Sequence, residues 1–220
     1  MMTPSKDELL VAVSSPERLE AVEATGLLDS PREESFDRLT RLAAKLTGAP
    51  VTFVSLVADG RDFYKSSFGF PEPLATRREL TGTTFCHHAL VSEGPLIIEN
   101  TLDDPIYRNV PTVESLGVRS YLGVPLINDS GQALGSFCAI DFKPRQWTPL
   151  DVEVMQELCA STLLEIELRS AVEKARISEE RFRAAAGAAS DVIRPSLGAR
   201  PSTISPETSL GARPSINTNS

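Results

Sequence analysis

Two pairs of strand-like segments, each joined by a tight turn, constrain the fold of this chain most strongly. Residues 51–58 (VTFVSLVA) are apolar and rich in β-branched side chains, and Asp59-Gly60 is a two-residue hairpin signal before RDFYKSSFG. Residues 119–127 (RSYLGVPLI) and 132–141 (QALGSFCAID) flank NDSG, which has the composition of a turn. The sequence therefore predicts two antiparallel hairpins.

Helix signals lie outside these hairpins. Ser30 is predicted to cap a helix that has Pro31 at its first position, and Glu33 would complete a capping box. Gly48 is expected to end this helix, because glycine readily adopts the left-handed conformation found after helix ends. Residues 85–91 (FCHHALV) indicate a short second helix.

The remaining segments complete the predicted fold class. Residues 69–82 contain two prolines and two glycines and are expected to be mostly loop, whereas 95–100 (PLIIEN) indicate another strand. The sequence TPLD at 148–151 begins a helix of about 35 residues or more, since no glycine or proline follows it before Gly187. We predict an α+β fold with a central antiparallel sheet, flanking helices and a long C-terminal helix.

The long helix permits two interpretations. Five of its apolar residues follow a heptad repeat, which predicts a coiled-coil dimer, although polar residues interrupt the same seam at 161, 165 and 179: Leu158, Leu168, Val172, Ala175 and Phe182. In the alternative, residues 148–168 pack on the sheet and the remainder is a solvated helix. The oligomeric state separates the two interpretations.

The pattern divides the chain into four parts. We expect an N-terminal extension at 1–15, the main domain at 16–170, a helical extension at 171–193 and a low-complexity, disordered tail at 194–220. The tail is rich in Pro, Ser and Gly, and it repeats the heptapeptide SLGARPS after 13 residues.

Charge and cysteine content exclude several classes of function. The formal charge is −8, with 30 acidic and 22 basic residues, so we expect neither nucleic acid nor an anionic membrane surface as a partner. The three cysteines have no CxxC spacing, which argues against a disulfide framework or a zinc site and favours a reducing compartment. With no signal peptide and no membrane-spanning apolar stretch, a cytoplasmic location is expected.

Several sequence blocks in a fixed order resemble the GAF domain, an antiparallel sheet flanked by helices. The blocks are GLLDSPREESFDRLTRLAAKLTGAPVTFVSLVADGRDFYKSSFG, TFCHHAL, IIENTLDDPIYRNVP and VRSYLGVPLINDSGQALGSFCAIDFKPRQWTPLDVEVMQEL. The resemblance covers about residues 16–170. This region is similar to the GAF domains that precede bacterial kinase or cyclase modules. Residues 178–193 are similar to the beginning of a PAS domain, which implies a fragment of a longer regulator.

The resemblance implies a ligand pocket where the sheet meets its loops. Apolar walls and converging polar groups are typical of such pockets, and they define the candidate ligand-binding residues: Phe63, Phe85, Cys86, His87, Asp103, Arg119 and Tyr121, with Tyr64, Phe137 and Asp104 beside them. In the structural alternative, Arg119 pairs with an aspartate and the aromatic residues belong to the core. No metal site is expected at Cys86, His87 and His88. Adjacent residues on a helix point about 100° apart, so these three side chains cannot converge on one ion.

These features favour a non-catalytic sensory domain that binds a small molecule and dimerises through its C-terminal helix. Motifs for phosphoryl transfer are absent, as is the cyclic-nucleotide signature of phosphodiesterase-type GAF domains, and no cofactor is expected. A pure dimerisation module is the main alternative. Two distant alternatives follow from the resemblance: a methionine sulfoxide reductase that uses pocket cysteines, and a bilin-binding domain that uses Cys86-His87.

Overall fold

The computed structural model describes residues 6–192, and their side chains from 9 to 186. The expected low-complexity tail at 194–220 lies outside the described residues. One compact unit extends to Ile177, and a second begins at Ser178. Among the described helices, none is both long enough and apolar enough to cross a lipid bilayer.

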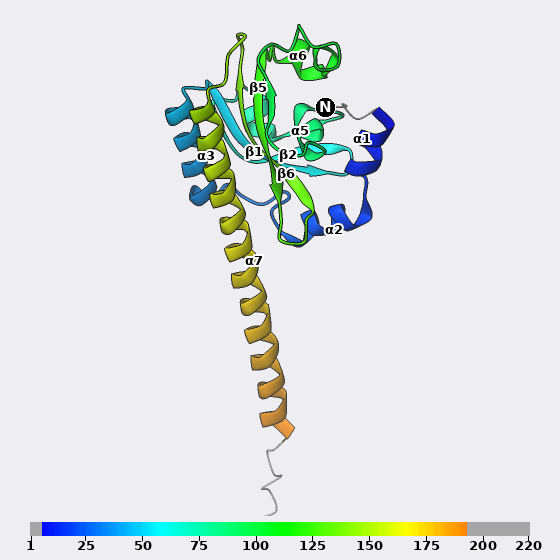
Figure 1. Ribbon diagram of the computed structural model, residues 1–220. Coiled ribbons are helices and arrows are strands. Elements are labelled where there is room, and N and C mark those ends of the chain that lie inside the picture. Colours follow the sequence, from blue (N-terminus) through cyan, green and yellow to red (C-terminus); the bar gives the residue numbers. More distant parts are fainter. Residues whose placement is uncertain (1–5, 193–220) are drawn as a thin grey trace, which may run out of the picture. The chain divides into compact units, whose positions relative to one another are not determined.

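A six-stranded antiparallel sheet lies at the centre of the first unit, with strand order β3-β2-β1-β6-β5-β4 (Figure 1). The predicted hairpins are confirmed as β1 (Val51–Ala58) with β2 (Arg61–Phe68), and β5 (Ser120–Ile127) with β6 (Ala133–Asp141). Strand β1 pairs with β6 and joins the hairpins into one sheet. The short strands β3 (Glu79–Thr81) and β4 (Leu96–Ile98) form its edges.

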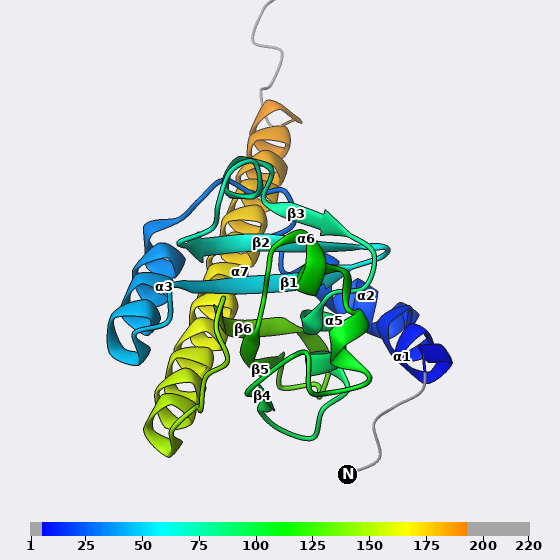
Figure 2. The same ribbon diagram turned by 90° about the horizontal axis from the view of Figure 1, so that it is seen from above.

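Helices cover both faces of the sheet (Figure 2). On one face lie α3 (Glu34–Thr47) and the part of α7 that belongs to the first unit; α7 as a whole spans Pro149–Val192. On the opposite face lie α1 (Lys6–Val13), α5 (Phe85–Leu90), the 3₁₀ helix η1 (Tyr107–Asn109) and α6 (Pro111–Ser115). Helix α2 (Pro16–Ala24) contacts β1 and β6. The predicted α+β fold class is confirmed.

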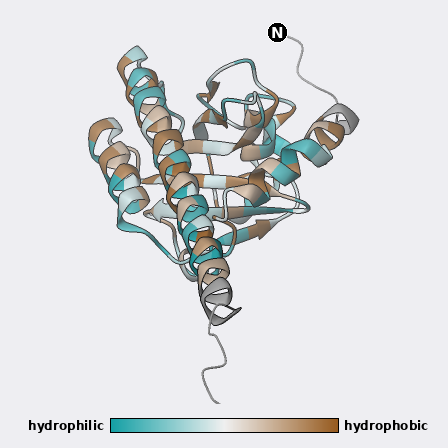
Figure 3. Ribbon diagram, turned by 90° about the horizontal axis from the view of Figure 1, so that it is seen from below, coloured by the Kyte–Doolittle hydropathy of each residue, from teal (hydrophilic) through white to brown (hydrophobic). Residues whose placement is uncertain are grey.

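Alternation along the strands produces two separate apolar cores. Side chains such as Leu56, Phe63 and Phe137 pack against α3 and α7. Their strand neighbours, including Tyr64 and Cys138, pack against α5 and α6. Because successive strand residues face opposite sides of a sheet, each helical layer has its own core. Along the helices themselves, hydrophobic and hydrophilic residues are mixed (Figure 3).

The two predicted helix starts have different outcomes. Thr148 and Asp151 cap α7 reciprocally, because each backbone N–H donates to the other's side chain at 2.9 and 3.1 Å. The predicted cap at Ser30 is wrong: α3 begins at Glu34, its N-cap is Glu33, and no side chain caps it. Ser30 Oγ instead donates to the Leu27 carbonyl and accepts a hydrogen bond from buried Lys65.

Short elements account for most of the other differences. The predicted loop at 69–82 contains α4 (Leu74–Arg77) and β3, which are too short to produce a recognisable periodicity. Helices α1 and α2 lie in a region for which no secondary structure was predicted. The predicted helix end at Gly48 is confirmed, with φ 67° at that glycine. The expected length of the last helix is also confirmed, since α7 has 44 residues.

Candidate functional site

A narrow pocket lies between the sheet and the helices α5 and α6. Its walls come from four strands, from α5 and α6 and from nearby loops: Phe53, Tyr64, Phe70, Thr84, Phe85, Cys86, Thr112, Leu116, Val118, Tyr121 and Ile140. Its volume is about 20 Å³, enough for roughly one water molecule. Pockets that hold drug-sized ligands measure about 300–1,000 Å³, so this pocket is closed in the structure.

The first turn of α5 connects the pocket to a buried carboxyl group. Thr84 caps α5, since its Oγ1 accepts from the Cys86 N–H at 3.2 Å, and His87 Nδ1 accepts from the Thr84 N–H at 3.2 Å. The same hydroxyl donates to Asp62 Oδ2 at 2.8 Å. Thr84 thus joins the start of α5 to the carboxyl group of Asp62 on β2.

Asp62 is completely buried under α5. Its second oxygen accepts a hydrogen bond from Ser55 on the neighbouring strand. Burial raises the pKa of Asp62 and outweighs the hydrogen bonds from Ser55 and Thr84, which lower it. The environment of this carboxyl group therefore opposes negative charge.

Two cysteines lie side by side next to this carboxyl group. Cys86 Sγ of α5 is 3.9 Å from Cys138 Sγ of β6, and the Cys138 sulfur also lies 3.2 Å from the Tyr121 hydroxyl and 3.0 Å from Ser136 Oγ. Burial raises the pKa of Cys86 well above its usual value. The same effect raises the pKa of Cys159, on the other face of the sheet, to about 12. The thiols of Cys86 and Cys159 are therefore protonated near neutral pH.

Aromatic rings fill most of the remaining space. Phe53, Tyr64 and Phe70 contact one another with centroid distances of 4.9 to 5.2 Å. Phe85 stacks on Tyr121 at 5.1 Å. Such pairs add about 0.5–1.5 kcal/mol beyond the burial of their area, so this wall of the pocket is well packed.

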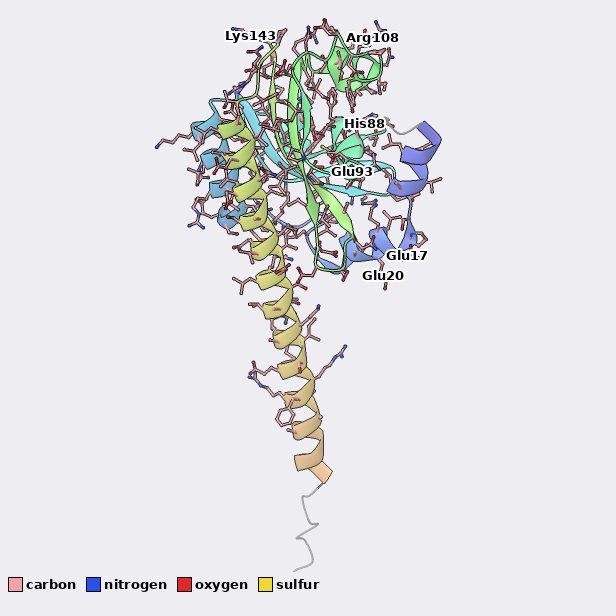
Figure 4. All side chains as sticks on the ribbon, in the orientation of Figure 1. Glu17, Glu20, His88, Glu93, Arg108 and Lys143 are labelled. Carbon is pink, nitrogen blue, oxygen red and sulfur yellow. The ribbon has the colours of Figure 1, made fainter. Side chains whose placement is uncertain are left out.

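The adjacent histidines are both uncharged near neutral pH. Burial lowers the pKa of His87 to about 4, and it also lowers the pKa of His88. His88 packs edge-on against Tyr107 at 5.3 Å (Figure 4 labels it on α5). Within residues 6–192, no group of three or more His, Cys, Asp or Glu side chains is arranged to hold a metal ion.

The structure brings together only some of the predicted ligand-binding residues. Phe85, Cys86 and Tyr121 line the pocket, as does Tyr64, and His87 adjoins it through the Thr84 cap. Whether any of them binds a ligand stays a prediction.

Phe63 and Phe137 do not belong to this pocket, because they pack on the opposite face of the sheet. There Phe63 lies beside the guanidinium groups of Arg61 and Arg78. The prediction grouped all nearby aromatic residues and ignored strand alternation, which turns Phe63 away from its neighbour Tyr64.

The expected charged groups also lie outside the pocket. Asp103 is exposed and accepts a hydrogen bond from the Asn100 amide. Asp104 Oδ1 accepts from two backbone N–H groups at the start of η1. Arg119 donates to the carbonyls of Val113 and Val118, at 2.9 and 3.0 Å. Its role is to hold α6 in place.

Sequence reasoning missed four polar residues in or beside the pocket: Asp62, Thr84, Thr112 and Ser136. For Asp62 a signal was available. Residues two apart on a strand lie on the same face of the sheet, so Asp62 shares its face with Tyr64. Similarly, Thr84 directly precedes the predicted short helix, where threonine is a preferred cap. For Thr112 the sequence holds no comparable signal, because α6 is too short to produce a recognisable periodicity.

Comparison with known proteins places these features in a family. A cyclic di-GMP phosphodiesterase of Pseudomonas aeruginosa is 30% identical over 125 residues, which are 56% of this chain. The chain spans only 21% of that relative's length.

Two solved structures share the fold. The PixJ GAF domain of Thermosynechococcus elongatus, in its blue-light absorbing form, aligns with a TM-score of 0.54 and 18% identity, covering 76% of this chain and 98% of that domain. The free methionine-R-sulfoxide reductase of Neisseria meningitidis aligns with a TM-score of 0.51 and 16% identity, covering 79% and 98%. The GAF domain model matches residues 31–166, more than half of the chain. This chain therefore belongs to the GAF domain family.

Proposed function

We propose that this chain is a non-catalytic regulatory domain of a bacterial signalling protein, which senses a small molecule in the pocket under α5 and α6 and transmits the change through α7. One observation carries the proposal: an ion cluster around the buried Lys65 ammonium joins a strand of the pocket wall to α7. The relative from P. aeruginosa, a cyclic di-GMP phosphodiesterase of which this chain spans about a fifth, supports a signalling setting.

The ion cluster consists of Lys65, Glu33 and Arg169. The Lys65 ammonium is fully buried and lies 2.5 Å from Glu33 Oε1, with further acceptors at Ser30 and Pro31. Arg169 of α7 donates from Nε to the same Glu33 oxygen at 3.1 Å. One carboxylate thus binds a strand lysine and a helix arginine together.

The position of Lys65 connects this cluster to the pocket. It is the extra residue of a β-bulge, because Val54 pairs with Ser66 and Ser55 pairs with Tyr64. Tyr64 lines the pocket on one face of β2, and Lys65 contacts the cluster on the other. A displacement of Tyr64 by a ligand would shift this bulge and, through Glu33, the hold on Arg169.

The state of the cysteines supports a non-catalytic role. Reduction of a sulfoxide by cysteine requires an accessible thiolate, and all three cysteines of this chain are buried. Burial raises the pKa of Cys86 and Cys159, so the reactive form is scarce. The free thiols also fit the reducing cytoplasm, which we propose as the location.

Dimerisation through α7 is the second part of the proposal. Leu164, Leu168 and Val172 are 66%, 61% and 61% exposed and lie on one side of the helix at spacings of four residues. A second copy of α7 would cover this stripe. If no ligand binds, dimerisation alone is the alternative function.

Native mass spectrometry of the full chain, purified without a refolding step, tests the proposal. We expect a dimer whose mass exceeds that of two chains by a retained small molecule. An empty dimer would favour the pure dimerisation module. An empty monomer would contradict both.

A further inference from the structure

We propose that the pocket binds a small, uncharged ring compound that donates a hydrogen bond to the hydroxyl of Thr112. This inference rests on the proposed sensing function and specifies its ligand class. It follows from the shape of the pocket walls, from their charge and from one unpartnered hydroxyl group.

The walls favour a flat, largely apolar ligand. Five of the lining residues are aromatic: Phe53, Tyr64, Phe70, Phe85 and Tyr121. Aromatic faces stack on other rings at little entropic cost, since each side chain has only two rotatable bonds. A planar ring therefore fits between them better than a branched or extended molecule.

The charge of the walls excludes anions. Among the described residues that line the pocket, none is basic. The nearest ionisable groups are acidic or phenolic, and burial raises the pKa of Asp62, Tyr64 and Tyr121. Each of these groups resists a negative charge, and a phosphate or carboxylate at the same place would meet the same opposition.

Cations are disfavoured by the same burial. His87, one helical residue after Cys86, has its pKa lowered to about 4. The buried Asp62 carboxyl group does not line the pocket, and it already accepts hydrogen bonds from Ser55 and Thr84. An uncharged ligand avoids the cost of burying either a negative or a positive charge in this pocket.

Thr112 supplies the specific contact. The residue is only 7% exposed, it lines the pocket, and its Oγ1 has no hydrogen-bond partner. A buried hydroxyl without a protein partner costs about 1–3 kcal/mol, and a ligand group that donates to Oγ1 would remove this cost. An N–H or O–H on the ring would provide that donor.

The size of the pocket couples binding to movement. A cavity of about 150 Å³ accommodates benzene, whereas this one measures about 20 Å³. Ring binding must therefore displace the wall formed by α6, which Arg119 holds through the Val113 carbonyl. Occupation of the pocket and displacement of α6 are then the same event.

Three commercially available probes with one ring system separate the charge classes: indole is neutral, indole-3-acetate is an anion and tryptamine is a cation. Isothermal titration calorimetry of the full chain at neutral pH should show indole binding, with both charged probes at least about tenfold weaker. Equal or tighter binding of either charged probe would overturn the proposal, as would absence of indole binding at millimolar concentration.

Two matched variants locate the site. Thr112→Val preserves the shape and removes the hydroxyl, so indole affinity should fall about fivefold or more. Thr83→Val is the control, because Thr83 lines a separate groove with Leu9 and His88 and should leave the affinity unchanged. The proposal is wrong if Thr83→Val weakens indole binding, or if Thr112→Val does not.

Failure of this inference is distinguishable from failure of the sensing function. If the indole series fails while native mass spectrometry recovers a bound compound, only the ligand class is wrong. If both experiments find an empty pocket, the sensing function fails as well.

Discussion

At the residue scale, His87 joins stability to pH. Its Nδ1 accepts the Thr84 N–H at the start of α5, and burial lowers its pKa from 6.5 to about 4. The folded state thus keeps this imidazole neutral at pH values where the unfolded chain protonates it. Below pH 6.5 the unfolded state binds more protons, so acid lowers the free energy of unfolding.

Replacement of His87 should remove this dependence. Between pH 7.5 and pH 5, the contribution of His87 to the free energy of unfolding should fall by about 2 kcal/mol, at roughly 1.4 kcal/mol per pKa unit. His87→Gln preserves the capping acceptor but does not titrate. Urea unfolding at both pH values should show wild type losing about 2 kcal/mol more than the variant. Equal losses in the two proteins would refute a buried neutral His87.

The cysteines provide a second test at this scale. With its pKa raised to about 12, Cys159 should react with iodoacetamide roughly a thousandfold more slowly in the folded chain than a free cysteine. Cys86 should be similarly slow, because burial acts on it in the same direction. Mass spectrometry after timed alkylation measures both rates. Rapid labelling of Cys86 under native conditions would revive a catalytic interpretation.

Only part of the site was predictable at the residue scale. Phe85, Cys86 and Tyr121 were identified as pocket residues, because a short helix and a strand that face each other bring them together. Asp103 and Arg119 were misplaced, since their loop follows no periodic pattern that fixes side-chain direction. Asp62 is buried beside Ser55 on β1 and Thr84 at the start of α5, both of which donate hydrogen bonds to it. The sequence alone does not reveal that these three residues come together.

At the element scale, the ion cluster connects β2 to α7 through Glu33. Glu33→Gln would leave the buried Lys65 ammonium without its carboxylate, which should lower the free energy of unfolding by about 3 kcal/mol. Lys65→Met removes the buried charge itself and should cost less, about 1 kcal/mol. Urea unfolding of both single variants and of the double variant measures the coupling.

The double variant is the control for this interpretation. Once Lys65 is methionine, Glu33→Gln should have a much smaller further effect, because only the partly exposed pair with Arg169 is then lost and no buried ammonium is left to compensate. Strictly additive losses would show that the two residues act independently and that the proposed connection fails.

The elements themselves were more predictable than the site. Both hairpins followed from strand composition and turn residues, and the TPLD sequence located the start of α7. Ser30 carried an equally good local cap signal, yet its hydroxyl binds Lys65 instead. A buried ammonium 35 residues away needed that oxygen, and a local pattern holds no information about such a demand.

At the scale of the whole molecule, the exposed stripe on α7 predicts a dimer. Replacing both Leu168 and Val172 by glutamate places two charges at the expected interface, so light scattering after size exclusion should change from dimer to monomer. Leu42→Glu on α3 is the control, because Leu42 is partly exposed outside this stripe. A wild-type monomer at micromolar concentration would contradict the dimer.

The proposed sensing function requires the pocket and α7 to respond together. Hydrogen–deuterium exchange tests it most directly, with the chain compared empty and loaded with the compound that it retains in native mass spectrometry. We predict altered exchange both around α6, at residues 109–118, and in α7, at residues 165–177. A change confined to the pocket, with exchange in α7 unaltered, would contradict the claim.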